Sequence, residues 1–249
     1  MMTRVISKEK LRSVWEVINP AEQITRIKLA VFSLPAVANN ASEVLQAAPY
    51  LVFIYILYGS IDFLIQLNPA AEVTGLTTLF TLIIAAGAIT LTYIETHNTL
   101  SNRPPIQTPW KYTLLRLPQL IGTAIAVTIV VLLGLTVFVI PGIYLSFRLI
   151  TSLPATVLED GGIRHGIQDS FTATDGQFTL IVVFGGVLSV IATVIVIGLV
   201  STRGVTQLGF AFLLSGPIQL VTHILLAMLY LNGRGEEIIP QSDAFTSQP

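Results

Sequence analysis

The sequence contains no cysteine and few charged residues. Among its 249 residues there is no cysteine, and Asp, Glu, Lys and Arg together make up only 11%. Without thiols the chain can form no disulfide, no cysteine-ligated zinc site and no cysteine nucleophile. The formal net charge is -1, so no strong positive field attracts nucleic acid, and we expect no nucleic-acid partner.

Motifs of catalysis and cofactor binding are also missing from the sequence. It has no H-E-x-x-H zinc motif, no G-x-S-x-G nucleophile elbow and no Walker or dinucleotide-binding glycine loop. Glu236-Glu237 resembles the paired glutamates of prenyl-protein proteases, but Gln241 stands where those enzymes have an arginine. We therefore predict that the protein is not an enzyme, and we expect no catalytic residues, no metal and no cofactor.

Apolar residues dominate the composition instead. They make up 53% of the chain, and the mean hydropathy is +0.76, whereas a soluble domain has about 25% charged residues. A membrane core about 30 Å thick needs about 20 apolar residues per helix. The sequence therefore predicts an all-α fold, a polytopic transmembrane helical bundle with about six spans. These spans are 50–67, 75–94, 118–140, 143–158, 177–200 and 207–231.

The stretch from Pro118 to Leu158 decides the topology of the later spans. Its only charge is Arg148, and Pro141-Gly142 divides it near the middle. As one helix it would be about 60 Å long, twice the thickness of the membrane core. Because Pro-Gly is a turn dipeptide, we predict that the chain reverses there and forms two spans. The alternatives are a kink within one span, or a re-entrant or interfacial segment at 143–158.

The distribution of basic residues favours this reversal. With six spans and a cytoplasmic N-terminus, every Lys and Arg except Arg148 and Arg203 falls on the inner side or in the cytoplasmic termini. A kink instead of a turn would move Arg164 and Arg234 outside, against the positive-inside rule. We therefore expect a multi-pass protein of the cell (plasma) membrane, with its N-terminus and C-terminus both in the cytoplasm.

An amphipathic helix is predicted near the N-terminus. One face repeats at helical spacing and comprises Leu11, Val14, Trp15 and Ile18. This helix lies either on the inner membrane surface or against the cytosolic loops. Pro35 and Asn39-Asn40 interrupt the shorter apolar pieces that follow. The domain organisation is thus 1–49, a cytoplasmic or interfacial N-terminal region, then 50–231, the transmembrane helical domain, and 232–249, a polar, disordered tail.

Asp62 and Arg148 are the candidate functional residues inside the spans. Each lies five or six residues from the outer end of its predicted helix, roughly 8–9 Å below the outer surface. Because ionisable groups inside a membrane usually pair, they form a hypothetical intramembrane ion pair between the first and fourth spans. The alternative is that each side chain reaches the interface separately. For His223, in the last span, a hydrogen bond between helices is favoured over a proton relay.

The connection at 159–176 predicts a short amphipathic helix along the inner surface. Ile163, Ile167 and Phe171 repeat at i, i+4 and i+8 and form an apolar stripe. Gly161-Gly162 precedes the helix and Asp175-Gly176 forms a turn before the fifth span. We expect a structural connector rather than a binding site.

The residues from Pro141 to Gly176 resemble a pattern found in a known group of membrane proteins. The segments PGIYLSFRLITSLPATVLEDGG and GIQDSF are similar to those of YciC-like proteins and of the glycerophosphoryl diester phosphodiesterase membrane-domain family, which are archaeal or bacterial. The matching positions are Pro141, Gly142, Pro154, Glu159, Gly166, Ile167, Ser170, Phe171, Thr174 and Gly176. The family pattern usually has alanine at Gly166.

This resemblance implies a polytopic helical bundle, often with six spans, and no established activity. No phosphodiesterase barrel or carboxylate and histidine metal cluster accompanies the segment, so the enzymatic half of the family description does not carry over. We predict a structural or accessory role in the membrane, with the lipid bilayer and other membrane proteins as partners. The alternative is a small transporter or permease-like component with discontinuous helices near Pro141-Gly142 and Gly216-Pro217.

Overall fold

The computed structural model describes residues 33–67, 71–175, 177, 179–181, 183 and 205–236, with side chains described except at 62–67, 71–76 and 205–215. Every regular element in these ranges is an α-helix, which confirms the all-α prediction. The helices are α3 (Leu34–Ala47), α4 (Tyr50–Leu67), α5 (Ala71–Leu100), α6 (Pro109–Val137), α7 (Val139–Arg148), α8 (Ser152–Leu158), α9 (Gly162–Ala173) and α11 (Val205–Gly233). The predicted N-terminal amphipathic helix lies outside the described residues.

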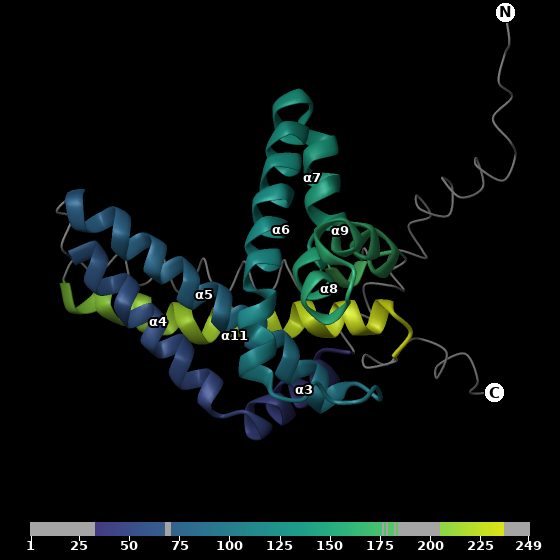
Figure 1. Ribbon diagram of the computed structural model, residues 1–249, viewed down its shortest axis with the longest axis horizontal. Coiled ribbons are helices and arrows are strands. Elements are labelled where there is room, and N and C mark those ends of the chain that lie inside the picture. The colour runs from purple at the N-terminus through teal and green to yellow at the C-terminus, as the bar shows by residue number, and fades with distance from the viewer. Residues whose placement is uncertain are drawn as a thin grey trace, which may run out of the picture.

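The helices form two arms that diverge from a common base (Figure 1). One arm contains α4, α5 and α11, which pack against one another. The other is a hairpin of α6 and α7, which project side by side away from the rest (Figure 1). α8 and α9 pack against each other and against α6, so they lie at the base of this hairpin.

Two helices in the described part of the chain are long and apolar enough to cross a membrane. They are Thr77–Leu100 of α5 and Pro109–Val137 of α6. Leu34–Ala47 and Tyr50–Ile61, which meet at a bend of 90°, would count as a third candidate if they are one broken span. Most of the predicted run 177–200 lies outside the described residues. These candidates are fewer than the six spans expected from the sequence.

The helix α3 was not expected, because Pro35 and Asn39-Asn40 looked like interruptions. Pro35 instead occupies the first turn of the helix, where a missing N–H costs nothing because the first amides of a helix have no partner within it. Asn39 is tolerated because its side-chain amide donates to Glu43 Oε1 at 3.1 Å, one turn further on. The region 21–49 is therefore partly helical.

The predicted chain reversal after α6 is confirmed, but Pro141-Gly142 does not form the turn. The reversal falls at Phe138, whose backbone is extended, and Pro141 and Gly142 lie in the first turns of α7. Proline fits there for the same reason as Pro35. Gly142 allows the two helices to touch, because a Cβ atom at this position would lie 2.4 Å from the backbone nitrogen of Leu135.

The predicted span 143–158 is not one helix. α7 ends at Arg148, the chain turns through Leu149–Thr151, and α8 then runs for seven residues. At 1.5 Å per residue, the ten residues of α7 extend about 15 Å. The segment 143–158 therefore forms two short helices instead of the single spanning helix that the sequence predicts.

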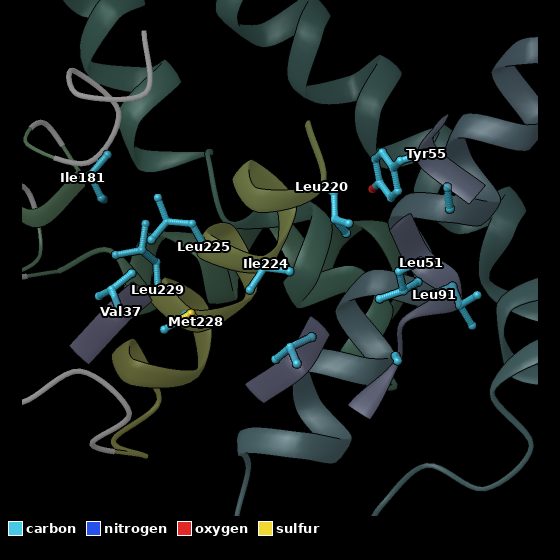
Figure 2. Packing of buried hydrophobic residues seen from close by; sticks show 13 residues of the cluster. Val37, Leu51, Tyr55, Leu91, Ile181, Leu220, Ile224, Leu225, Met228 and Leu229 are labelled. Atoms are coloured by element: carbon cyan, nitrogen blue, oxygen red, sulfur yellow. The ribbon is translucent and has the colours of Figure 1, made fainter. Parts of the chain in front are cut away.

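The largest apolar core lies where α3, α4, α5 and α11 meet (Figure 2). Leu51, Leu91 and Ile224 are fully or almost fully buried there. Gly216 lets α11 contact α4 directly, since a Cβ atom would lie 2.4 Å from the carbonyl oxygen of Tyr55. α11 runs without a break through Pro217, so the predicted helix discontinuity at Gly216-Pro217 is wrong.

Candidate functional site

Glu159 is the centre of a charged junction between three parts of the chain. It follows the last residue of α8, and its carboxylate accepts hydrogen bonds from Arg103 Nη1 at 3.1 Å and from the Tyr230 hydroxyl at 3.1 Å. Arg234 Nη2 lies 3.4 Å from the same oxygen. Arg103 belongs to the connection between α5 and α6, whereas Tyr230 and Arg234 lie at the end of α11. One carboxylate therefore ties three segments together.

The first residues of the predicted tail also belong to this junction. Arg103 Nε lies 2.8 Å from Oε1 of Glu236, whose side chain is largely buried. Burial lowers the pKa of Arg103, but its hydrogen bond to Glu159 and the negative charges of Glu236 and Glu159 outweigh that effect, so the pKa is raised and the group stays charged. We call Arg103, Glu159, Tyr230, Arg234 and Glu236 the Glu159 junction. Residues 232–236 are thus held in place, while 237–249 lie outside the described residues.

A second ion pair lies beside this junction. Arg116 of α6 pairs with Asp160, donates to Gln119 Oε1 at 2.7 Å and to the Tyr112 hydroxyl at 2.7 Å. The Arg116 side chain is mostly buried, whereas Asp160 is almost fully exposed. This contact fixes the residues after α8 against the first half of α6.

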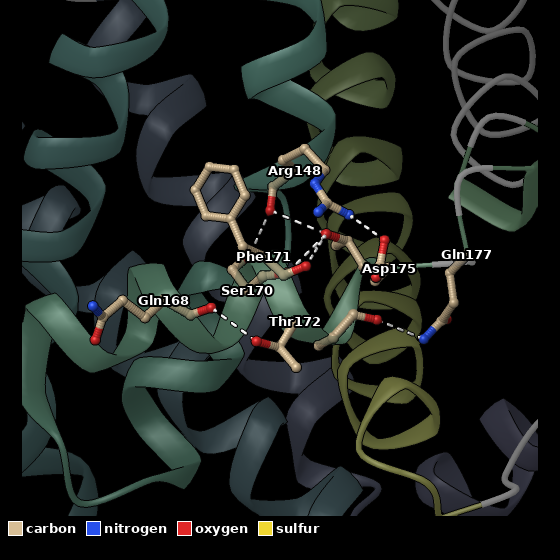
Figure 3. A network of polar contacts seen from close by, with 9 residues as sticks. Arg148, Gln168, Ser170, Phe171, Thr172, Asp175 and Gln177 are labelled. Carbon is tan, nitrogen blue, oxygen red and sulfur yellow. Dashed lines mark hydrogen bonds and ion pairs between the residues drawn. The ribbon is translucent and has the colours of Figure 1, made fainter. Parts of the chain in front are cut away.

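The break between α7 and α8 is held by hydroxyl groups from α9 (Figure 3). Ser170 Oγ donates to the carbonyl oxygen of Arg148 at 2.7 Å, and the Thr151 hydroxyl lies 3.0 Å from Ser170 Oγ. Thr174 Oγ1 lies 3.4 Å from the same carbonyl. The last carbonyls of a helix have no partner within it, and here Ser170 supplies one. Ser170 and Thr174, both part of the family-like pattern, therefore stabilise the end of α7.

The Arg148 side chain contacts one carboxylate and two aromatic rings. Its Nη1 lies 3.3 Å from Asp175 Oδ1 (Figure 3). Its guanidinium lies 5.4 Å from the ring centroid of Phe171 and 5.9 Å from that of Tyr144. Both rings are within the range of cation–π attraction. The Asp62 side chain lies outside the described residues, so the Asp62–Arg148 ion pair stays a prediction.

The amphipathic connector is present as α9, but it buries a different face. The buried residues are Gly166, Ser170 and Ala173, whereas Ile163 is exposed and Ile167 and Phe171 are only partly covered. Contact with α8 explains why this face of α9 is buried, because a Cβ atom at Gly166 would lie 1.9 Å from Thr156 Oγ1. Glycine in place of the family's usual alanine therefore allows close contact between α8 and α9.

The structure also places Pro154 of the family-like pattern and His223. Pro154 is buried within α8, and Gly176 lies outside the described residues. His223 Nδ1 lies 3.1 Å from the Tyr93 hydroxyl, which joins α11 to α5, so the predicted hydrogen bond between helices is confirmed. On α5, Glu95 accepts a hydrogen bond from the Tyr50 hydroxyl at 2.5 Å.

Sequence reasoning missed the partners of Glu159. Arg103 and Arg234 were counted only as topology markers, although each lies just beyond an apolar run, where charged groups from different helices gather at one depth. In the described part of the chain, no three His, Asp or Glu side chains come together in a way that could hold a metal ion.

The comparison with protein families agrees with the motif. Residues 112–233 match the family described as the membrane domain of glycerophosphoryl diester phosphodiesterase. The family resemblance is confirmed. The matched segment includes most of α6, together with α7, α8, α9 and α11, whereas Arg103 lies outside it. Neither a curated protein nor a solved structure matches the chain.

Proposed function

We propose that the protein is a multi-pass protein of the cell membrane without catalytic activity, with a structural or accessory role. Both termini lie in the cytoplasm, and its partners are the lipid bilayer and other membrane proteins. This proposal rests on the contacts that the polar residues of the family-like pattern make. Glu159, Ser170 and Thr174 all connect helices of the same chain.

The contacts of Arg148 and His223, two polar residues within the apolar runs, support the same proposal. Arg148 contacts Asp175, Phe171 and Tyr144, and His223 contacts Tyr93. A group that already has protein partners must give them up before it can bind a solute. These existing contacts of Arg148 and His223 therefore favour a structural role over a role in transport.

A transporter is the second candidate, and the break between α7 and α8 favours it. Discontinuous helices expose backbone groups that can bind solutes. Here the Arg148 carbonyl at the break accepts the hydroxyl of Ser170, so a solute would have to compete for it. We therefore place this function second.

Reconstitution of the full chain into liposomes tests these alternatives. We expect no solute flux above that of empty liposomes and no hydrolysis of glycerophosphodiesters. Flux that Arg148→Gln abolishes, while the thermal unfolding profile stays unchanged, would replace our proposal by the transporter. Hydrolysis by the purified chain would contradict the absence of catalysis.

A cellular experiment tests the structural role directly. We expect cells lacking the protein to leak an impermeant dye more readily under osmotic stress. Wild type and Glu43→Gln, a control at an exposed position of α3, should restore the barrier, whereas Glu159→Gln should restore it less well. Equal leakage in cells with and without the protein would count against the structural role.

A further inference from the structure

The end of the α6–α7 hairpin is almost entirely apolar, and the hydroxyl of its exposed Thr136 donates to the carbonyl oxygen of Leu132 in the same helix. Around the turn, Phe138 is 68% exposed, Val139 62% and Ile140 81%. On α6, the exposed Leu132, Leu133 and Leu135 point in different directions, because successive helical residues are rotated by about 100°. A helix that is hydrophobic all round belongs in a protein core or in a membrane. Only 11% of the apolar window of α6 is buried within the protein.

Polar groups mark the base of this hairpin. Arg148 ends α7, and its partner Asp175 has a side chain that is 82% exposed. Arg164 and His165, on α9, are exposed as well, and α9 packs against the α6 helix, where Ile163 faces Gly122. Exposed charges are strongly disfavoured in hydrocarbon. The boundary between hydrocarbon and the polar headgroup region therefore lies near the base of α7.

The distance from this boundary to the turn is too short for a crossing. The ten residues of α7 separate the turn from Arg148, which is about 15 Å at 1.5 Å per residue. The membrane core is about 30 Å thick. On α6, the last buried residue is Thr123. The 14 residues from there to Val137 extend about 21 Å, which is also less than the thickness of the core.

We propose that the α6–α7 hairpin is a re-entrant wedge that enters the acyl chains of a single leaflet and turns back near the middle of the bilayer. Lipid is the occupant because the exposed apolar surface encircles the hairpin, whereas a protein partner would cover one side. If the end of the hairpin lay in water, the three adjacent apolar side chains at the turn, which are mostly exposed, would all face water. The close contact of Gly142 with the backbone of Leu135 makes the wedge slender.

Single introduced cysteines in the full chain test the position of the turn, since no native cysteine interferes. We expect Val139→Cys to resist a membrane-impermeant maleimide from both sides of sealed vesicles. Arg164→Cys, the matched control on α9, should react from one side only. Reaction of Val139→Cys from the side opposite to Arg164→Cys would show a complete crossing and overturn the wedge.

Depth-dependent quenching distinguishes lipid from protein as the covering. A fluorophore on Val139→Cys should be quenched at least threefold more by lipids spin-labelled near the end of the acyl chain than by lipids labelled near the headgroup. A fluorophore on Thr128→Cys, an exposed position lower on α6, should show the reverse order. Stronger quenching at position 139 by the lipids labelled near the headgroup would contradict the wedge. Absence of quenching by either lipid would contradict it as well, because it would indicate that protein covers the end of the hairpin. Ile140→Cys, at the most exposed position of the turn, serves if Val139→Cys does not accumulate.

Discussion

The α6–α7 hairpin and the Glu159 junction hold helices together by different means. In the hairpin, α6 and α7 meet through glycine, with Gly134 and Gly142 facing each other across the contact. In the junction, segments meet through charged and hydroxyl groups around one carboxylate. The hairpin is apolar and exposed, whereas the junction is polar and partly buried.

This difference shows which interactions can stabilise a helix contact in hydrocarbon and which can do so near water. In hydrocarbon, helices gain nothing from burying apolar surface against each other, so close van der Waals contact between small residues decides their packing. At the polar base, charges can be paired and still reach water, so ion pairs add rigidity at a small desolvation cost. The hairpin should therefore be sensitive to side-chain volume, and the junction to charge.

Enlarging Gly142 should have the largest effect. Gly142→Leu would place a side chain into the backbone of Leu135, and we expect a loss of about 3 kcal/mol, the upper end for overpacking. Thermal unfolding in detergent measures the loss, and spin labels at positions 133 and 144 should move apart. Gly87→Ala is the control, because no atom lies within 4 Å of a Cβ there. Equal stability of the two variants would refute the glycine contact.

Removing the charge of Glu159 should have the next largest effect. Glu159→Gln keeps the side-chain volume but weakens the bonds from Arg103, Tyr230 and Arg234, and we expect a loss of about 1–2 kcal/mol. The value is modest because the Arg103 side chain is 41% exposed and solvent screens the pair. Thermal unfolding again provides the measurement. The comparison between hairpin and junction fails if Glu43→Gln, the exposed control, is equally destabilising.

Loss of the Ser170 hydroxyl should loosen the break between α7 and α8. Ser170→Ala removes the donor to the Arg148 carbonyl, and we expect a loss of about 1 kcal/mol, with faster hydrogen exchange confined to residues near 149–153. Ser42→Ala is the control, since its hydroxyl bonds only within α3. Unchanged exchange near the break would show that Ser170 does not hold the end of α7.

Neutralising Asp175 should have the smallest effect. The Asp175 side chain is mostly exposed, so Asp175→Asn should cost about 0–0.5 kcal/mol, and less at high salt. Arg148 keeps its contacts with Phe171 and Tyr144. Unfolding measured at low and high ionic strength provides the check. A loss as large as that of Glu159→Gln would mean that the Arg148–Asp175 pair is buried within the working protein.

The sequence was sufficient for the long apolar helices but not for α3 or for the breaks between helices. Apolar runs and their lengths predicted α4 and α11 nearly to the residue, because in lipid only a helix satisfies its own backbone polar groups. They did not predict that 143–158 breaks after Arg148. That break depends on Ser170, which comes from a different helix and satisfies the exposed carbonyl.

The candidate site was predictable in its members but not in its pairings. The family-like pattern named Glu159, Ser170, Phe171 and Thr174 without showing what they touch. Arg103 and Tyr230 join Glu159 from positions 56 and 71 residues away in the chain. Such contacts follow from how helices are placed side by side, and local sequence does not encode that placement.

By itself, the sequence determined the helical class, the similarity of residues 112–233 to a membrane-domain family and the absence of thiol chemistry. Each follows from composition, from the order of residues or from the local rule that backbone groups in hydrocarbon must bond within a helix. The tertiary structure alone decided that the turn lies at Phe138, that α9 buries Gly166 rather than Ile163, and that Glu159 joins three segments. These features depend on atoms from distant segments competing for the same space or the same hydrogen-bond partner.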